Sequence, residues 1–231
     1  MKLYHGTNEA FWPHISLKGL RPRGRRKSQW RRYPSRKDMV YLTTAYPFYF
    51  ALNTRGSGRA MVLEIESDEL NEELFFPDED FVVQGLALNK MNIEQIHDDV
   101  RANLEAYQQH WKLSVEKLGN CCYKDNIHAA AIKRVCFFDP EARPLIAHAM
   151  LEPTISIINY HLFQATYRSL VAWMFGDIVE FPQDPGVELY LSTKSSNTAP
   201  GGIAVGEGIK KHCAKRKQES KDRTSIEVVR F

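Results

Sequence analysis

Apolar residues in the first 140 positions form short runs, and their spacing alternates between that of strands and that of helices. Met61, Leu63 and Ile65 alternate with their neighbours, which predicts a strand over residues 60–66. Shorter apolar runs predict further strands over residues 2–5, 39–43, 120–127 and 132–138. The run 81–83 is another strand candidate, and residues 226–231 are either a closing strand or a frayed tail.

Helical spacing covers most of the remaining apolar residues. Over residues 92–118 an apolar residue recurs every three or four positions, which predicts one long helix. A helix over 9–18 is expected to end at Gly19, and one over 45–53 opens at Pro47, a residue suited to a first turn. Residues 145–175 are predicted to be largely helical, with their aromatic side chains in the core. Residues 182–208 are expected to be loop with short strands.

This order of elements predicts an α+β fold with a mainly antiparallel sheet. Neither a GxGxxG nor a GxxxxGK[ST] sequence is present, which argues against a doubly wound dinucleotide-binding domain. We divide the chain into a domain over residues 1–140 and a largely helical extension with a basic tail over residues 141–231.

Composition limits the class of protein. Of the 231 residues, 43% are apolar, enough for a substantial core. The four cysteines are too few for a disulfide framework in a chain of this length, and no metal-ligand spacing is present. Neither a signal peptide nor an apolar run of membrane-spanning length occurs. We therefore expect a cytoplasmic protein with no metal and no membrane association.

The net charge is only +3, but basic and acidic residues are concentrated in separate segments of the chain. A basic loop over residues 21–37 has no acid until Asp38, whereas residues 68–80 are strongly acidic. A second basic run lies at 210–217. Loop residues with interleaved aromatic side chains suit a phosphate backbone and unpaired bases, and the alternative is a solvated, mobile loop. The nucleic-acid-binding candidates are Arg25, Arg26, Trp30, Arg31 and Arg32.

Two short motifs carry the chemistry. The first is Tyr4-His5-Gly6-Thr7, at the end of the first predicted strand, and the second is the strand and helix VYLTTAYPFYFA over residues 40–51. In this order, the motifs make residues 1–140 resemble the ADP-ribosyltransferase superfamily, in its diphtheria-toxin and poly(ADP-ribose) polymerase branch. Bacterial nucleic-acid-modifying toxins of the DarT type are similar in the same region.

The resemblance implies a split sheet with flanking helices and NAD as a co-substrate. His5 would then bind a ribose hydroxyl, Gly6 would offer its backbone to the nicotinamide carboxamide, and Thr7 would help cap the next helix. Tyr41 would stack on the nicotinamide ring, with Tyr49 or Phe50 covering the other side. The implied cofactor-binding residues are His5, Gly6, Thr7, Arg36, Tyr41, Thr43, Tyr49 and Phe50, with Arg36 assigned to the pyrophosphate.

The residue that stabilises the transition state is less certain from the sequence. Many relatives place a glutamate on a late strand, and the matching position here is Asn120, which cannot neutralise a cation. Other carboxylates are alternatives, namely Asp78, Glu79, Asp80, Glu116, Asp125 and Glu227. The catalytic candidates are His5, Tyr41, Asn120 and Glu79.

The function that the resemblance implies is transfer of ADP-ribose from NAD to a nucleic acid, RNA or single-stranded DNA. A toxin or phage-defence role, with an antitoxin protein as partner, would fit this chemistry. Two alternatives stay open: an RNA 2′-phosphotransferase-like enzyme, and a catalytically inactive module that binds NAD or RNA.

Overall fold

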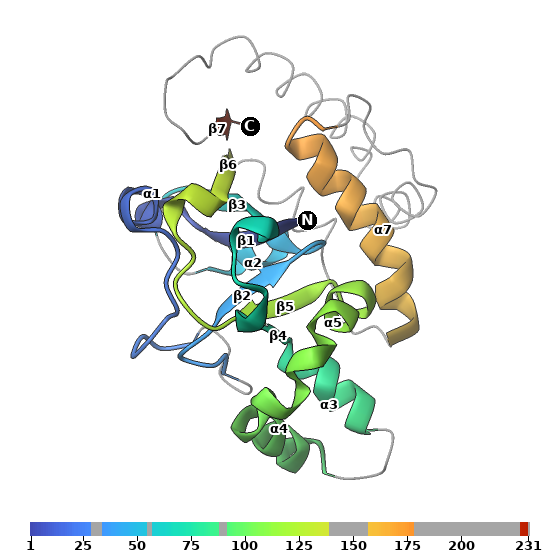
Figure 1. Cartoon of the computed structure of the whole chain (residues 1–231). Helices are drawn as coiled ribbons and strands as arrows, with labels where there is room; N and C mark the ends of the chain where they lie inside the picture. Colours follow the sequence, from blue (N-terminus) through green and yellow to red (C-terminus); the bar gives the residue numbers. More distant parts are fainter. Residues whose placement is uncertain (29–33, 55–56, 88–91, 139–156, 178–226, 231) are drawn as a thin grey trace.

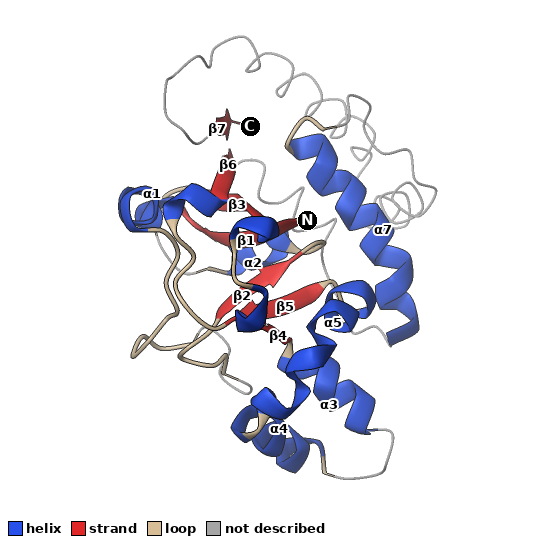
Figure 2. Ribbon diagram, in the orientation of Figure 1, coloured by secondary structure: helices blue, strands red, loops and turns tan. Residues whose placement is uncertain are grey.

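The structure is a computed structural model that describes residues 1–28, 34–54, 57–87, 92–138, 157–177 and 227–230. Seven strands form one sheet in the order β4-β5-β2-β1-β3-β6-β7 (Figures 1 and 2). Neighbouring strands are antiparallel, except that β7 runs parallel to β6. The strands are β1 (Lys2–Asn8), β2 (Val40–Thr43), β3 (Ala60–Glu66), β4 (Phe75–Pro77), β5 (Asn120–Tyr123), β6 (Ile132–Phe138) and β7 (Glu227–Arg230).

Helices lie on both faces of this sheet, so that the predicted α+β class and mainly antiparallel sheet are confirmed. The α-helices are α1 (Trp12–Lys18), α2 (Pro47–Asn53), α3 (Glu79–Ala87), α4 (Ile93–Ala102), α5 (Trp111–Lys117) and α7 (Ile157–Met174). Short 3-10 turns are η1 (Glu9–Phe11), η2 (Ser67–Glu69), η3 (Glu72–Leu74), η4 (Leu104–His110) and η5 (Ala129–Ala131). No helix in the described ranges has the length and apolarity needed to cross a bilayer.

The sheet consists of two halves that meet between β1 and β2. Strand β1 pairs with β3 from Lys2 to Asn8, but its register with β2 consists of Tyr4 opposite Thr43. Beyond this pair, the remaining residues of β1 have no recorded partner in β2 within the described chain. The pairing between β1 and β2 is therefore limited to one end of β1, and the two halves diverge beyond it.

Three clusters of buried side chains fill the space between the sheet and the helices. Successive residues of a strand point to opposite faces of the sheet. On one face, Leu3 and its neighbours pack against α1 and α5. On the other face, Tyr4 packs with α2 and α7, while Cys122 packs with α3 and α4. As predicted, Trp173 and Phe175 belong to the core.

Some predicted elements differ in kind or length. Residues 81–83 are helical, because the run belongs to α3, where the Asp78 side chain accepts a hydrogen bond from the Asp80 N–H at 2.9 Å. The single helix predicted over 92–118 is interrupted at Asn103, whose φ of −123° and ψ of 28° are not helical. Strand β5 ends at Tyr123, short of the predicted limit of 127. Residues 145–156 and 182–208 lie outside the described residues.

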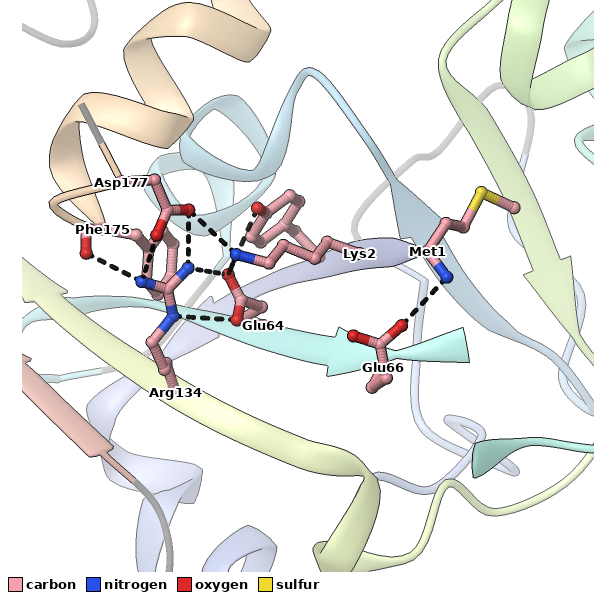
Figure 3. Close-up of polar contacts among 8 residues, drawn as sticks. Met1, Lys2, Glu64, Glu66, Arg134, Phe175 and Asp177 are labelled. Atoms are coloured by element: carbon pink, nitrogen blue, oxygen red, sulfur yellow. Dashed lines mark hydrogen bonds and ion pairs between the residues drawn. The ribbon is translucent and has the colours of Figure 1, made fainter. Parts of the chain in front are cut away.

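A partly buried ionic cluster joins the segment after α7 to the sheet (Figure 3). Arg134 of β6 donates to Glu64 of β3, with Nε at 2.8 Å from Oε1, and also to Asp177 and the Phe175 carbonyl. Lys2 of β1 reaches the carboxylates of Glu64 at 3.6 Å and Asp177 at 3.0 Å. The Glu64 side chain is only 5% exposed, so its charge depends on these partners.

We expect Arg134→Met to destabilise the fold by about 3 kcal/mol, because it leaves the Glu64 carboxylate buried with weaker compensation. The double variant Arg134→Met/Glu64→Leu should recover much of this loss, because it removes both charges. Urea unfolding of the two variants tests this. A double variant that is less stable than Arg134→Met would contradict the explanation.

Candidate active site

His5 lies in β1, where β1 and β2 separate. Its Nδ1 is 2.9 Å from the backbone carbonyl oxygen of Tyr41 in β2, and because a carbonyl can only accept, Nδ1 carries the proton. Burial lowers the pKa of His5, and the hydrogen bond to Tyr41 opposes this only in part. The imidazole is therefore neutral near pH 7, and Nε2 is a hydrogen-bond acceptor.

Tyr41 connects β2 to the acidic turn and to the basic loop. Its hydroxyl donates to Glu79 Oε1 at 2.6 Å and accepts from the Arg36 backbone N–H at 2.7 Å. Burial, and then the neighbouring Cys122 and Glu79, raise the pKa of Tyr41. The phenol therefore stays protonated. Its orientation is fixed by the hydrogen bond that the hydroxyl donates and the one that it accepts. His5, Tyr41 and Glu79, three of the four catalytic candidates, are thus joined by successive contacts.

Glu79 is a buried carboxyl, 6% exposed, at the start of α3. Burial raises its pKa above the usual 4.5, and the nearby Asp80 adds to the increase, whereas the Tyr41 hydroxyl and Arg101 oppose it. Asp78 beside it is also buried, and burial raises its pKa in the same direction. The side chains of Asp78 and Glu79 are therefore buried, and the acidic turn is not a solvated loop at these two residues.

Asn120 begins β5 and lies opposite Thr43 of β2. Its backbone carbonyl accepts from Ser114 at 2.8 Å, while its side-chain Oδ1 is buried and has no hydrogen-bond partner among the described residues. A buried polar atom without a partner is costly unless a ligand or water supplies the missing bond. Asn120 therefore differs from Glu79 in chemistry, as an amide and not a carboxyl, and it shares no recorded contact with His5, Tyr41 or Glu79 among the described residues.

The Thr43 hydroxyl has a structural role. It donates to the Gly119 carbonyl at 2.9 Å and accepts from the N–H groups of Ala45 and Tyr46, which lead into α2. These three bonds use the donor and both lone pairs of the hydroxyl. The Thr43 side chain therefore has no hydrogen-bonding capacity left for a cofactor, and only its backbone could bind one.

Gly6 is required by the packing of α2 on β1. A Cβ at this position would lie 2.1 Å from the Pro47 carbonyl oxygen and 2.4 Å from the Ala51 nitrogen. Phe50 is adjacent, with its Cβ 3.0 Å from the same point, and Tyr49 is half-buried. No recorded ring contact places Tyr49 or Phe50 against Tyr41 among the described side chains.

The expected cap of the next helix is corrected. Thr7 is buried, but the side chain that caps η1 is that of Asn8, which accepts from the Ala10 N–H at 2.9 Å. The sequence pattern placed the cap one residue too early because β1 continues to Asn8.

Arg36, the candidate for the pyrophosphate, is already engaged. Its guanidinium pairs with Asp38 at 2.9 Å and Glu105 at 3.2 Å, and it also donates to the Arg101 carbonyl. These partners raise the pKa of Arg36. A phosphate would have to compete with two carboxylates for this side chain.

The basic loop is anchored at both ends. Leu20 pairs with Ile127, and the Arg23 guanidinium binds the Ser35 carbonyl. Arg25 and Arg26 are exposed and make no ion pair with a described residue. Trp30, Arg31 and Arg32 lie outside the described residues.

The remaining carboxylates that the sequence offers as alternatives, outside the acidic turn, do not contact His5, Tyr41 or Glu79 in any recorded interaction of the described chain. Asp125 and Glu116 are exposed, and Glu116 pairs with Lys117. Glu227 lies in β7 at the far edge of the sheet from β5. Among the described residues, no group of three His, Cys, Asp or Glu could hold a metal ion.

Two residues of α7 were not anticipated as part of this region. Gln164 is buried and donates to the Lys117 carbonyl at 2.6 Å, and Arg168 reaches Thr44 at 3.2 Å, next to the Thr43–Asn120 pair. The apolar spacing of this helix predicts core packing and gives no signal for these contacts.

Comparisons with known proteins give little further guidance. No family model and no curated protein matches the chain. A solved structure named EcPltA is similar over 62% of this chain and 79% of its own, with 11% identity and a TM-score of 0.36. A similarity this weak is compatible with the expected fold and does not establish it.

We expect Glu79→Gln to preserve the fold and to change its pH dependence. A carboxyl whose pKa is raised on folding binds its proton more tightly when folded, so stability falls as pH rises above 4.5 towards the raised value. Glutamine does not titrate, so the variant should lose part of this fall and be at least as stable as the wild type at pH 7.

Urea unfolding between pH 4 and pH 8 measures this effect. Glu116→Gln, at an exposed carboxyl, is the matched control and should follow the wild type. An unchanged pH profile for Glu79→Gln would show that burial does not keep this carboxyl protonated.

Proposed function

We propose that the chain is an NAD-consuming ADP-ribosyltransferase that modifies a nucleic acid. The observation that carries the proposal is the connection of His5, Tyr41 and Glu79 at the line where the sheet splits. The two motifs that suggest the family from the sequence are thus in contact, through the His5 side chain and the Tyr41 backbone. The remote similarity to EcPltA adds no support for an activity.

The chemistry of these groups fits NAD. A neutral His5 Nε2 can accept a hydrogen bond from a ribose hydroxyl, and the partnerless Asn120 Oδ1 can accept another. Breaking the bond between nicotinamide and ribose develops positive charge on the sugar, which a carboxylate or an oriented dipole stabilises. In this proposal His5 positions the ribose, and Tyr41, held by Glu79, forms a fixed wall.

Glu79 and Asn120 would divide the work that a single glutamate performs in many relatives. Glu79 is a carboxyl, but it already accepts from Tyr41 and its raised pKa disfavours the charged form. Asn120 has an amide dipole whose buried oxygen has no hydrogen-bond partner among the described residues. We therefore assign Glu79 to positioning Tyr41 and Asn120 to direct contact with the substrate.

The Asn120 amide also favours one alternative, an inactive module that binds NAD. An amide can hold a ribose without accelerating the loss of nicotinamide, because it carries no negative charge. Release of nicotinamide separates the active enzyme from this module.

His5→Ala should reduce nicotinamide release from NAD by about 100-fold or more, because the ribose loses its positioning group. His14→Ala is the control, since His14 is exposed on α1. His14→Ala should retain the thermal stability of the wild type, whereas His5→Ala should fold but melt at a lower temperature, because it loses the hydrogen bond to the Tyr41 carbonyl. Release by His5→Ala at the wild-type rate would refute the assignment of this site.

The nucleic-acid acceptor is supported by the basic loop, because its exposed arginines have no described carboxylate partner. The loop continues into Arg36, whose backbone N–H binds the Tyr41 hydroxyl, so it borders the candidate site. A polyanion bound to the loop would lie close to the reacting sugar.

Transfer to single-stranded RNA or DNA should therefore fall steeply with salt, whereas NAD hydrolysis should change little. Neutralising Arg25, Arg26, Arg31 and Arg32 should lower the salt slope of binding by about 0.7 for each phosphate that is no longer neutralised. Lys112→Ala and Lys133→Ala, outside the loop, are controls. Label transferred from NAD to protein, and never to nucleic acid, would contradict this acceptor.

A further inference from the structure

Arg168 of α7 lies at the end of the sheet where β5 begins. Its Nε donates to Thr44 Oγ1 at 3.2 Å, and Thr44 binds the Gly119 carbonyl through its own N–H at 2.7 Å. Asn120, with its buried and partnerless Oδ1, follows Gly119 directly. Helix α7 therefore brings a cation to the strand end that carries the candidate substrate-binding amide.

The orientation of this guanidinium is fixed by neutral groups. Nη2 donates to the Val115 carbonyl at 3.2 Å and to Gln164 Oε1 at 3.1 Å. Gln164 is buried, and its Nε2 donates to the Lys117 carbonyl, which leaves Oε1 to face the arginine. Three of the five N–H groups of Arg168 are thus used to hold it in place.

The remaining donors and the charge are not used within the described chain. Arg168 is exposed and has no ion pair with a described residue, and Nη1 has no recorded partner there. Arg36, Arg59 and Arg134, in contrast, each pair with a carboxylate. An arginine that is held by hydroxyl, carbonyl and amide oxygens, and whose remaining edge has no partner in the described part of the chain, is suited to binding a phosphate.

We propose that Arg168 binds a phosphate of a substrate beside Asn120. The inference rests on the proposed function for the identity of that substrate. The phosphate belongs either to the pyrophosphate of NAD or to the backbone of the nucleic-acid acceptor, and both have the same chemistry. Because Arg36 is occupied by two carboxylates, Arg168 is the better placed of the two arginines to bind an anion.

The test measures binding by the full chain to three probes: inorganic pyrophosphate, ADP-ribose and a single-stranded oligonucleotide. Arg168→Gln should weaken binding by about 10-fold or more, because a charge-assisted hydrogen bond is removed. Arg168→Lys should recover part of the affinity, since it restores the charge without the fork. Lys112→Ala, at an exposed lysine of α5, is the control and should bind as the wild type does.

The pattern of weakened binding identifies the source of the phosphate. Weakened ADP-ribose binding with normal oligonucleotide binding assigns Arg168 to NAD, and the reverse pattern assigns it to the acceptor. Wild-type affinity of Arg168→Gln for all three probes, or no binding of any probe by the wild type, would overturn the inference. Nicotinamide release is measured separately: its absence in the wild type refutes the proposed function, even if pyrophosphate binding still depends on Arg168.

Discussion

The hydrogen bond from His5 to the Tyr41 carbonyl connects the two halves of the sheet at the point where they separate. Strand β1 is held by β3 along its length, whereas its register with β2 consists of the Tyr4–Thr43 pair. The imidazole spans the beginning of the split and contacts the backbone of the residue whose ring forms the proposed wall. The same bond fixes the tautomer, so the geometry of the sheet determines that Nε2 of His5 is the nitrogen that can accept a hydrogen bond.

Much of the sheet was predictable because its strands have strong local signals. Alternation over residues 60–66 gives the bounds of β3 without error. The apolar runs at 39–43 and 132–138 give β2, with one residue too many at its start, and β6. Residues 81–83 were assigned wrongly, because three adjacent apolar residues fit a strand and a buried helix equally well. The deciding contact, the Asp78 carboxylate on the Asp80 N–H, is specific to the turn and leaves no periodicity in the sequence.

For the candidate site, the sequence motifs single out some of the residues, whereas the roles of others depend on their tertiary contacts. His5 and Tyr41 stand in motifs that can be identified along the chain, and they do come together. The roles of Gly6, Thr43 and Arg36 depend on neighbours that are far away in sequence. Helix α2 occupies the space beside the glycine, the Gly119 carbonyl accepts from the threonine hydroxyl, and Glu105 helps to neutralise the guanidinium. A sequence motif identifies such residues but not their role. Only the contacts in the folded structure distinguish a structural role from ligand binding.

Helix α7 gives the extension beyond residue 140 a physical connection to the proposed chemistry. At its end, Asp177 binds Arg134 and Lys2, which fixes the helix to the half of the sheet that contains β1. Earlier in the helix, Arg168 contacts Thr44, in the loop that precedes α2, and Gln164 contacts Lys117 at the end of α5, both in the other half. Helix α7 therefore contacts both halves of the sheet. The division at residue 140 is less sharp in the structure than composition suggests, because a helix from beyond it contacts both halves and brings the Arg168 cation next to the strand end that carries Asn120.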